Sequence, residues 1–386
     1  MSLPEFVRPI TTSPGYHWFG YYDKLQFDIT NRYVLAMKVE FEHRSPNKDD
    51  WVDIGLIDLE DNDEWTKIGQ TTAWCWQQGC MLQWRPGQEN QIIWNGRQND
   101  QFVSHIFDIK TGQKRTLPQA IYTLSSDGET AIGTDFRRIN HMRPGYGYAG
   151  ISDPYQDELA PDDSGIYHLN LDTGYHQQII SLADVVQIPY PHGNISQAKH
   201  YFNHLLFSPR GDRFIFLHRW RFDDGGFHTR MLTSAADGTD VRVVDDSGRT
   251  SHFIWKDNEN ILAWSWHPSY KDKFYLFGDG NGQVEVCAPQ IMVENGHCSY
   301  LPDSNWILND TYPTGNSYQE LYLYHCLTNS KTRLVSFPAL PVYKGEWRCD
   351  LHPRFSRDGR WVTVDSAHQN GRQIYLVDLI TAGIYD

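Results

Sequence analysis

LLFSPRGDRFIFLHR, residues 205–219, holds two apolar stretches separated by a Pro-Arg-Gly-Asp turn. Aromatic and branched residues dominate both stretches, and Gly, Pro and Asp gather in the turn, which is typical of a β-hairpin. PRFSRDGRWVTVDS, residues 353–366, has the same layout around an Asp-Gly turn. Two hairpins of one design, far apart in the chain, predict an internal repeat.

The hairpin recurs five more times, at residues 25–39, 82–96, 122–135, 253–266 and 298–311. Each of the seven copies is followed by a third apolar segment, such as SHIFDIKTGQ (104–113). The spacing is mostly near the ~40–50 residues of a propeller blade. We therefore predict an all-β fold, a single seven-bladed β-propeller over residues 1–386. A β-sandwich with an appended domain is the alternative, but seven evenly distributed copies fit a closed ring better.

Two features at the edges of the repeat need their own explanation. Phe6 and Val7 precede the first copy, and we expect this segment to pair with the last blade, because an open ring would expose strand edges.

The spacing between the third and fourth copies is long and contains RPGYGYAGISDPYQDELAPDD, residues 143–163. This stretch predicts an insertion loop, and long loops of this kind usually carry function or are disordered.

The bulk composition excludes some partners. The formal net charge of −14 argues against nucleic acid, which needs clustered Lys and Arg. No apolar run reaches the ~18 residues of a membrane span, and the N-terminus lacks a basic start followed by an apolar stretch. The six cysteines show no disulfide-framework spacing. We expect a cytoplasmic protein, or a periplasmic or secreted one if a signal has been removed. Nothing in the sequence indicates an oligomeric state.

The sharpest local pattern is a histidine at one position of four consecutive copies. In each copy it lies seven residues before the turn Gly or its equivalent: His204, His252, His297 and His352. The first strand of a propeller blade lines the central channel, so we expect these side chains near one end of that channel, on neighbouring blades. A lone His at a strand start is usually a hydrogen-bonded structural residue. Four in one register indicate a ligand or a metal.

The loops between second and third strands point to the same face. They carry Arg97, Arg137, Arg138, Arg219, Arg221, His267, Asp310, Tyr312 and His368. Any one of these residues could belong to an ordinary solvated rim. Together they predict a cationic mouth on an acidic protein, and such a local inversion of charge favours an anionic ligand. Guanidinium groups bind carboxylates in bidentate geometry.

A metal site is predicted in the same region. His297 begins one blade, and Cys349 and His352 begin the next. Imidazole with thiolate suits zinc, and more oxygen-rich sites suit manganese or calcium. Buried Cys and hydrogen-bonded His are the alternative explanation. The sequence has no Gly-rich phosphate loop and no G-x-S-x-G elbow, so no organic cofactor is predicted.

Several of these stretches resemble motifs of bacterial propeller polysaccharide lyases. SHFIW (251–255), LHPRFS (351–356) and TRML (229–232) are similar to blade starts and an Arg-bearing strand of the oligogalacturonate lyases. FGYYDK (19–24) and the Gln-Gln-Gly run 77–79 look closer to the ulvan and rhamnosyl-glucuronate lyases. The resemblance implies cleavage of an acidic oligosaccharide by β-elimination at a uronic acid.

The resemblance also implies roles for individual residues. Tyr122 and Arg138 match a Tyr–Arg pair of these lyases, Arg219 matches a further Arg, and His43 loosely matches one of two His. Gln77 or Gln78 stands near the second His, and a Gln supplies no positive charge. Arg138 and Arg219 would bind the carboxylate, and the Arg138 cation would lower the pKa of Tyr122 so that it serves as base or acid. The expected substrate contacts are His204, His252, Arg97, Arg221, Arg230 and Gln78.

The leading functional hypothesis is therefore a lyase acting on a uronate-containing oligosaccharide. Two alternatives stay open on the sequence: a non-catalytic propeller that binds a glycan or a protein through the same face, and a metal-dependent hydrolase or isomerase. Fold alone does not separate them, because propellers support many functions.

Overall fold

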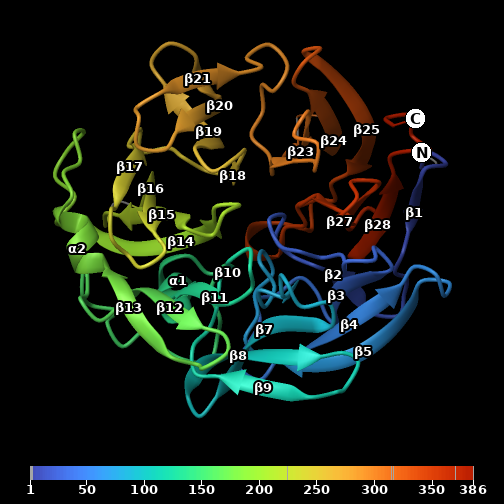
Figure 1. The fold of residues 1–386 in the computed structure, drawn as a ribbon, viewed down its shortest axis with the longest axis horizontal. Helices are drawn as coiled ribbons and strands as arrows, with labels where there is room; N and C mark the ends of the chain where they lie inside the picture. Colours follow the sequence, from blue (N-terminus) through green and yellow to red (C-terminus); the bar gives the residue numbers. More distant parts are fainter. Residues whose placement is uncertain (1–2, 224, 314, 316, 370, 386) are drawn as a thin grey trace.

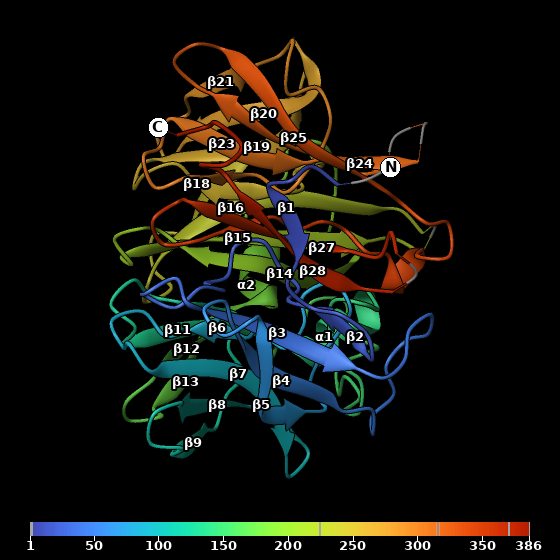
Figure 2. The same ribbon diagram turned by 90° about the vertical axis from the view of Figure 1, so that its right-hand side faces the viewer.

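The computed structural model describes residues 3–223, 225–313, 315, 317–369 and 371–385. Within these residues the strands form seven antiparallel four-stranded sheets. Figure 1 shows the sheets arranged in a ring around a central channel, and Figure 2 shows the ring from the side. The predicted seven-bladed β-propeller is confirmed.

The blades follow the chain, each running from the channel outwards. Their strands are β2 (Tyr16–Trp18), β3 (Tyr33–Val39), β4 (Val52–Asp58) and β5 (Glu64–Thr71); β6 (Gln83–Trp84), β7 (Gln91–Gln98), β8 (Gln101–Asp108) and β9 (Lys114–Leu117); β10 (Thr123–Leu124), β11 (Thr130–Thr134), β12 (Gly165–Asn170) and β13 (His176–Ser181); β14 (Lys199–Phe207), β15 (Arg213–Arg221), β16 (Phe227–Ala235) and β17 (Arg242–Asp245); β18 (Phe253–Trp255), β19 (Asn260–His267), β20 (Lys271–Gly278) and β21 (Val284–Cys287); β22 (Ser299–Tyr300), β23 (Trp306–Asp310), β24 (Tyr318–His325) and β25 (Ser330–Pro338); and β26 (Arg354–Phe355), β27 (Trp361–Ser366), β28 (Gln373–Asp378) and β1 (Val7–Pro9).

The N-terminal strand closes the ring. Strand β1 pairs antiparallel with β28, with Val7 opposite Val377 and Pro9 opposite Tyr375. The last blade therefore takes its outermost strand, β1, from the start of the chain, as Figure 1 shows. This is the closure expected for the segment near Phe6 and Val7.

The innermost strand of the first blade is interrupted. Trp18 pairs with Met37, and the strand resumes where Phe27 bridges Val34. The FGYYDK stretch between these points loops into the channel. The Asp365 carboxylate accepts hydrogen bonds from the backbone of Phe19 and Gly20 and fixes the start of the loop. Gly20 has φ +107°, and a Cβ there would lie 2.9 Å from the backbone of Gln78, so only glycine fits.

Helix is confined to loops in the described part of the chain. Helix α1 (Phe136–Met142) follows β11, α2 (Leu182–Gln187) follows β13, and the 3₁₀ turn η1 (Gly345–Trp347) precedes β26. Asp135 caps α1 by accepting from the backbone of Arg137 and Arg138. These helices are too short to leave a helical period in the sequence. None of the described helices is long and apolar enough to span a membrane.

Candidate active site

The four histidines of the common register meet at one end of the channel. The ring centroids of His252 and His297 are 4.2 Å apart, and those of His297 and His352 are also 4.2 Å apart. Tyr21 and Tyr22 of the FGYYDK loop fill the space beside them. The Tyr21 ring lies 4.8 Å from that of His204 and 5.4 Å from that of His352. The structure thus brings all four histidines into one cluster around the channel loop.

His204 is held at both ring nitrogens. Its Nδ1 lies 3.3 Å from the Tyr21 hydroxyl, and its Nε2 lies 3.0 Å from the Asp23 carboxylate, which also pairs with Lys24 at 2.9 Å. Burial lowers the pKa of His204 to about 4, although Asp23 opposes the shift, so the ring is neutral at pH 7. Its backbone has φ +52° at a bulge of β14, a conformation that non-glycine residues adopt mainly where the surroundings impose it.

His297 offers an unused nitrogen. Its Nδ1 donates to Asp310, whose two carboxylate oxygens both lie 2.9 Å away, so Nε2 carries the lone pair. That Nε2 is buried and has no hydrogen-bond partner among the described residues. Ligand atoms of His297, Asp350 and His352 all lie within 4.8 Å of one another. An oriented imidazole with a free lone pair, beside a second imidazole and a carboxylate, fits a divalent cation.

The predicted third ligand, Cys349, is not in this group; its neighbour Asp350 is. Residues 349 and 350 lie in an irregular stretch before β26, where the sequence does not fix which side chain faces the histidines. Burial raises the pKa of the Cys349 thiol to about 12, so it is not a thiolate at neutral pH. Without thiolate, two imidazoles and a carboxylate suit manganese as well as zinc.

Three arginines gather beside the histidines. The Tyr146 hydroxyl accepts from Arg348 Nη2 at 2.7 Å and from Arg143 Nη2 at 3.2 Å. Arg348 Nε also donates to Asp350 at 2.7 Å, so the arginine group is bonded to one of the candidate metal ligands. Arg219 is 5% exposed, and its Nε and Nη1 are buried without a hydrogen-bond partner in the described chain. The arrangement places three guanidinium groups together and balances only Arg348 with a carboxylate, Asp350, among the described residues. Such a partly buried cationic site favours an anionic ligand.

One tyrosine of the site differs from the rest. Burial raises the pKa of Tyr21, Tyr22, Tyr122 and Tyr312. Burial acts in the same direction on Tyr146, but the Arg143 and Arg348 cations outweigh it and lower its pKa below the usual value.

Sequence reasoning missed Tyr146 and both of its partners. Arg143 and Tyr146 lie in the stretch predicted as an insertion loop, RPGYGYAG, and Arg348 lies just before Cys349. An Arg and a Tyr three residues apart in a functional loop were the available signal.

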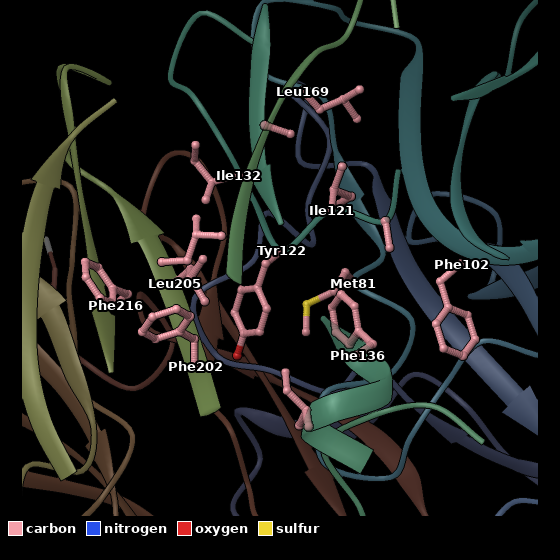
Figure 3. Packing of buried hydrophobic residues seen from close by; sticks show 14 of the residues in the cluster. Met81, Phe102, Ile121, Tyr122, Ile132, Phe136, Leu169, Phe202, Leu205 and Phe216 are labelled. Atoms are coloured by element: carbon pink, nitrogen blue, oxygen red, sulfur yellow. The ribbon is translucent and has the colours of Figure 1, made fainter. Parts of the chain in front are cut away.

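Tyr122 lies in the apolar core instead of an open pocket. Figure 3 shows it among buried residues that include Phe136 and Phe202, and its ring stacks on Phe136 with centroids 6.0 Å apart. Its oxygen accepts from Gln78 Nε2 at 2.5 Å and lies 3.4 Å from Asn203 Oδ1. The expected lowering of its pKa is wrong, because burial raises it.

Arg138 does not pair with Tyr122. Helix α1 turns the guanidinium towards the insertion loop, where it forms an ion pair with Asp153 at 3.1 Å and donates to several backbone carbonyl groups, those of Tyr155, Glu158, Leu159 and His200. Both charged side chains are almost fully buried. Arg138 therefore anchors the loop of residues 143–163 and has no donor left over for a substrate.

We expect an Arg138→Leu variant to lose about 3–5 kcal/mol of unfolding free energy, because Asp153 would remain as a buried charge without its partner. Urea unfolding followed by tryptophan fluorescence measures the loss. Arg137→Ala is the matched control, since its pair with Asp135 is partly exposed and should be worth about 1 kcal/mol or less. Equal stability of the two variants would contradict the anchoring role.

Three of the remaining predicted contacts are arginines bound to backbone. Arg97 donates to the carbonyl of Lys48, and Arg221 donates to that of Met142. Arg230 donates to His218 and to the carbonyls of Val185, Ile188 and Pro189 at the end of α2. These contacts give the three side chains a structural role in this conformation.

His43, His252 and Gln78 have different surroundings. The His43 ring lies against Tyr343, with centroids 4.8 Å apart. His252 Nδ1 lies 3.0 Å from Asn295 Oδ1, and its Nε2 lies 3.4 Å from the Tyr312 hydroxyl. Gln78 holds the Tyr122 oxygen. Of the three, His252 belongs to the histidine cluster.

Comparison with known proteins supports the fold. No protein-family model and no curated protein matches the chain. Among solved structures, an oligogalacturonate lyase from Vibrio parahaemolyticus has a TM-score of 0.65 at 15% identity, covering 96% of this chain and 93% of that one. An oligogalacturonate lyase in complex with manganese has a TM-score of 0.68 at 14% identity, covering 96% and 92%. The propeller domain of Cps50 (Swd1) from Myceliophteria thermophila has a TM-score of 0.52 at 9% identity, covering 96% and 99%. At these identities the likeness establishes a shared propeller fold.

Proposed function

We propose that the protein is a lyase that cleaves a uronate-containing oligosaccharide by β-elimination. The observation that carries the proposal is the buried Arg219 guanidinium, two of whose nitrogens have no partner among the described residues, next to the Arg143–Tyr146–Arg348 group. A buried cation without a counter-charge is costly, and a carboxylate would satisfy it in bidentate geometry. The propeller fold shared with oligogalacturonate lyases agrees with such a substrate.

The reaction requires a carboxylate-binding group before anything else. A guanidinium on the C6 carboxylate stabilises the negative charge that develops when C5 loses its proton, which is electrostatic stabilisation of the transition state. Arg219 would have this role. His252, which faces Tyr312 at the same site, would contact the sugar. His297, Asp350 and His352 would hold a divalent cation, which when bound supplies Lewis-acid stabilisation of an oxygen anion.

The test is incubation with a panel of uronate oligosaccharides, with and without added Mn²⁺, and neutral oligosaccharides of equal length as controls. The expected result is a rise in the ultraviolet absorbance of the unsaturated uronate product, confined to acidic substrates. If no uronate oligosaccharide is cleaved under either condition, the lyase function is wrong. Binding of the same panel without cleavage would then favour a non-catalytic glycan-binding propeller.

A further inference from the structure

A surface segment crosses the cluster and supplies two of its residues. Residues 339–350, here called the strap, leave the end of β25, pass through η1 and reach the start of the last blade. The strap contributes Arg348 and Asp350 to the site, while its outer residues Val342 and Lys344 are exposed. It is thus both a cover and a part of the site.

Polar contacts from several separate segments hold the strap. The Tyr343 hydroxyl donates to Glu42 Oε2 at 2.6 Å, and Ser45 Oγ donates to Glu346 Oε2 at 2.5 Å. Gln77 Nε2 donates to the carbonyls of Glu346 and Arg348 at 2.8 and 3.1 Å. Arg372 donates to the carbonyl of Arg348 at 3.0 Å. Segments held mainly by such contacts open more easily than packed core elements.

The space left around the strap is small. A pocket of about 140 Å³, lined by Tyr343, Lys344 and Arg348 among others, lies on one side. A pocket of about 170 Å³, lined by Ser45, Gly145 and Glu346 among others, lies on the other. Ligand pockets usually measure ~300–1,000 Å³. Neither space holds an oligosaccharide, so a sugar that binds beside Arg348 requires the strap to move and then to return.

The Tyr146 oxygen depends on the position of the strap. It accepts from Arg143, which follows α1, and from Arg348 of the strap, and guanidinium groups cannot accept a proton. The Arg143 guanidinium also lies 3.9 Å from the centroid of the Tyr146 ring. No described residue accepts a hydrogen bond from the Tyr146 hydroxyl. Because the Tyr146 oxygen accepts from two cations and has no described acceptor for its own proton, these surroundings favour the ionised form, a phenolate.

The other charged or titratable groups near Tyr146 do not cancel these two cations. Asp350 acts against ionisation, but Arg348 separates it from the ring oxygen through its own hydrogen bond to Asp350. Arg219 on β15 adds a cation to the same surroundings, and the neighbouring phenols Tyr21 and Tyr312 are held neutral by burial.

We propose that the strap is a closing element that switches on the reaction: on closing over the sugar it brings Arg348 to Tyr146, and Tyr146 as phenolate is the base that removes the C5 proton. This inference rests on the proposed lyase function. Tyr146 is the catalytic residue, Arg348 is its positioning partner, and Tyr343 holds the strap closed. Arg219 lies in the same cluster as Tyr146, as the chemistry requires, because C5 is bonded to the carboxylate carbon.

The elimination balances without another reactant. The phenolate oxygen forms an O–H bond as the C5–H bond breaks, and the released electron pair forms the C4=C5 double bond. The C4–O4 bond breaks, and O4 leaves with the electron pair of that C4–O4 bond. The proton on Tyr146 then returns to O4, which restores the phenolate and releases a hydroxyl end. A phenol of unperturbed pKa, near ~10, would be a poor base at neutral pH, so the two arginines are needed.

The first experiment needs no substrate. Tyrosine ionisation is followed by ultraviolet difference absorbance across a pH titration of the full chain. We expect one tyrosine to ionise before the others in the wild type, and this early step to vanish in Tyr146→Phe and to persist in Tyr122→Phe. Superimposable titrations of the wild type and Tyr146→Phe would overturn the phenolate.

The second experiment tests the strap at a distance from the reacting atoms. Tyr343→Phe removes one hydroxyl contact of the strap, the hydrogen bond to Glu42. The control, Tyr167→Phe on β12 of another blade, also removes one tyrosine hydroxyl, which donates to the Asp163 carbonyl. We expect Tyr343→Phe alone to move both the early ionisation and the rise of kcat/KM with pH to higher pH. The reason is that the base must be ionised, and a looser strap removes the Arg348 cation. Identical profiles for the two variants would overturn the role of the strap.

Activity separates this inference from the proposed function. With a cleaved substrate, Tyr146→Phe should lower kcat by ~10²-fold or more. A variant that keeps full kcat would overturn Tyr146 as the base and leave the lyase function standing. An early tyrosine ionisation in a protein that cleaves no uronate would overturn the lyase function and keep the strap-held phenolate.

Discussion

An Arg219→Leu variant should lose ~10²–10³-fold in kcat/KM on a uronate oligosaccharide and yet require more urea to unfold than the wild type. Truncating one partner of a buried charge pair in a complex costs ~2–5 kcal/mol, and about 1.4 kcal/mol corresponds to a tenfold change. In the free protein, by contrast, the Arg219 charge lowers the free energy of unfolding. Arg219 is buried, two of its nitrogens have no partner in the part of the chain that the structure describes, and burial beside Arg143 lowers its pKa. Replacing such a charge with an apolar side chain removes a desolvation cost.

Arg354→Leu is the control for the gain of stability that is expected together with the loss of activity. Arg354 is as deeply buried as Arg219, but its Nη2 donates to Asp365 at 2.8 Å and its Nε donates to Gln26 at 3.0 Å. Its loss leaves the buried Asp365 carboxylate without its cation and should destabilise the protein by about 3–5 kcal/mol. If Arg219→Leu is destabilised like Arg354→Leu, Arg219 has a structural partner and the carboxylate site is wrong. Kinetics on the cleaved substrate and urea unfolding give the two readouts.

The fold and the histidine cluster could be predicted from the sequence because both follow from a repeat. Seven hairpins of one design specify seven blades, and a residue at one position of each copy must lie at one height of the channel. The clustering of the four histidines could therefore be predicted without knowing the conformation of any loop. These residues are His204, His252, His297 and His352. The closing pairing of Val7 with Val377 followed from the same ring geometry.

The residues proposed to be reactive could not be predicted in this way, because loops place them. Arg138 was expected to lie beside Tyr122 and lower its pKa, but α1 begins at Phe136 and carries the guanidinium to Asp153. Tyr146 and Arg348 are far apart in the chain and meet only through the strap. The exchange of Cys349 for Asp350 shows a second limit. A motif shows which stretch of chain lies at the site, but which of its side chains faces the site depends on local backbone geometry.

The FGYYDK loop shows how one irregular stretch organises the whole site. It leaves the innermost strand of the first blade and places Tyr21, Tyr22 and Asp23 among histidines from four other blades. The Tyr22 hydroxyl donates to the Phe253 carbonyl at 2.7 Å. His297, whose Nε2 lone pair has no partner among the described residues, lies beside Tyr22 of this loop, with ring centroids 5.3 Å apart. The Arg219 cation acts on Tyr21 of the same loop. One loop therefore borders both the histidines and the buried arginine.

Metal binding is the other result with a large expected effect. Purified protein equilibrated with Mn²⁺ or Zn²⁺ and then dialysed should retain metal, and His297→Ala and His352→Ala should each lose it, as measured by elemental analysis. Asp350→Asn should also weaken binding, because the carboxylate is the anionic ligand of the group. Cys349→Ser is the matched control on the adjacent residue and should retain metal like the wild type.

Asp310→Asn tests the orientation of the imidazole separately from ligation. Asp310 is not in the ligand group, but its carboxylate accepts from His297 Nδ1 and from the backbone of His297 and His352. It therefore fixes which nitrogen of His297 is free and where both histidines lie. Outer carboxylates of this kind are typically worth 10–100-fold in metal affinity, so Asp310→Asn should lie between the wild type and His297→Ala in a metal titration. Loss of metal in Cys349→Ser, or retention in both His297→Ala and His352→Ala, would mean that the unpartnered Nε2 of His297 is not a metal ligand. These measurements follow metal content alone, so they decide the site whether or not a substrate has been found.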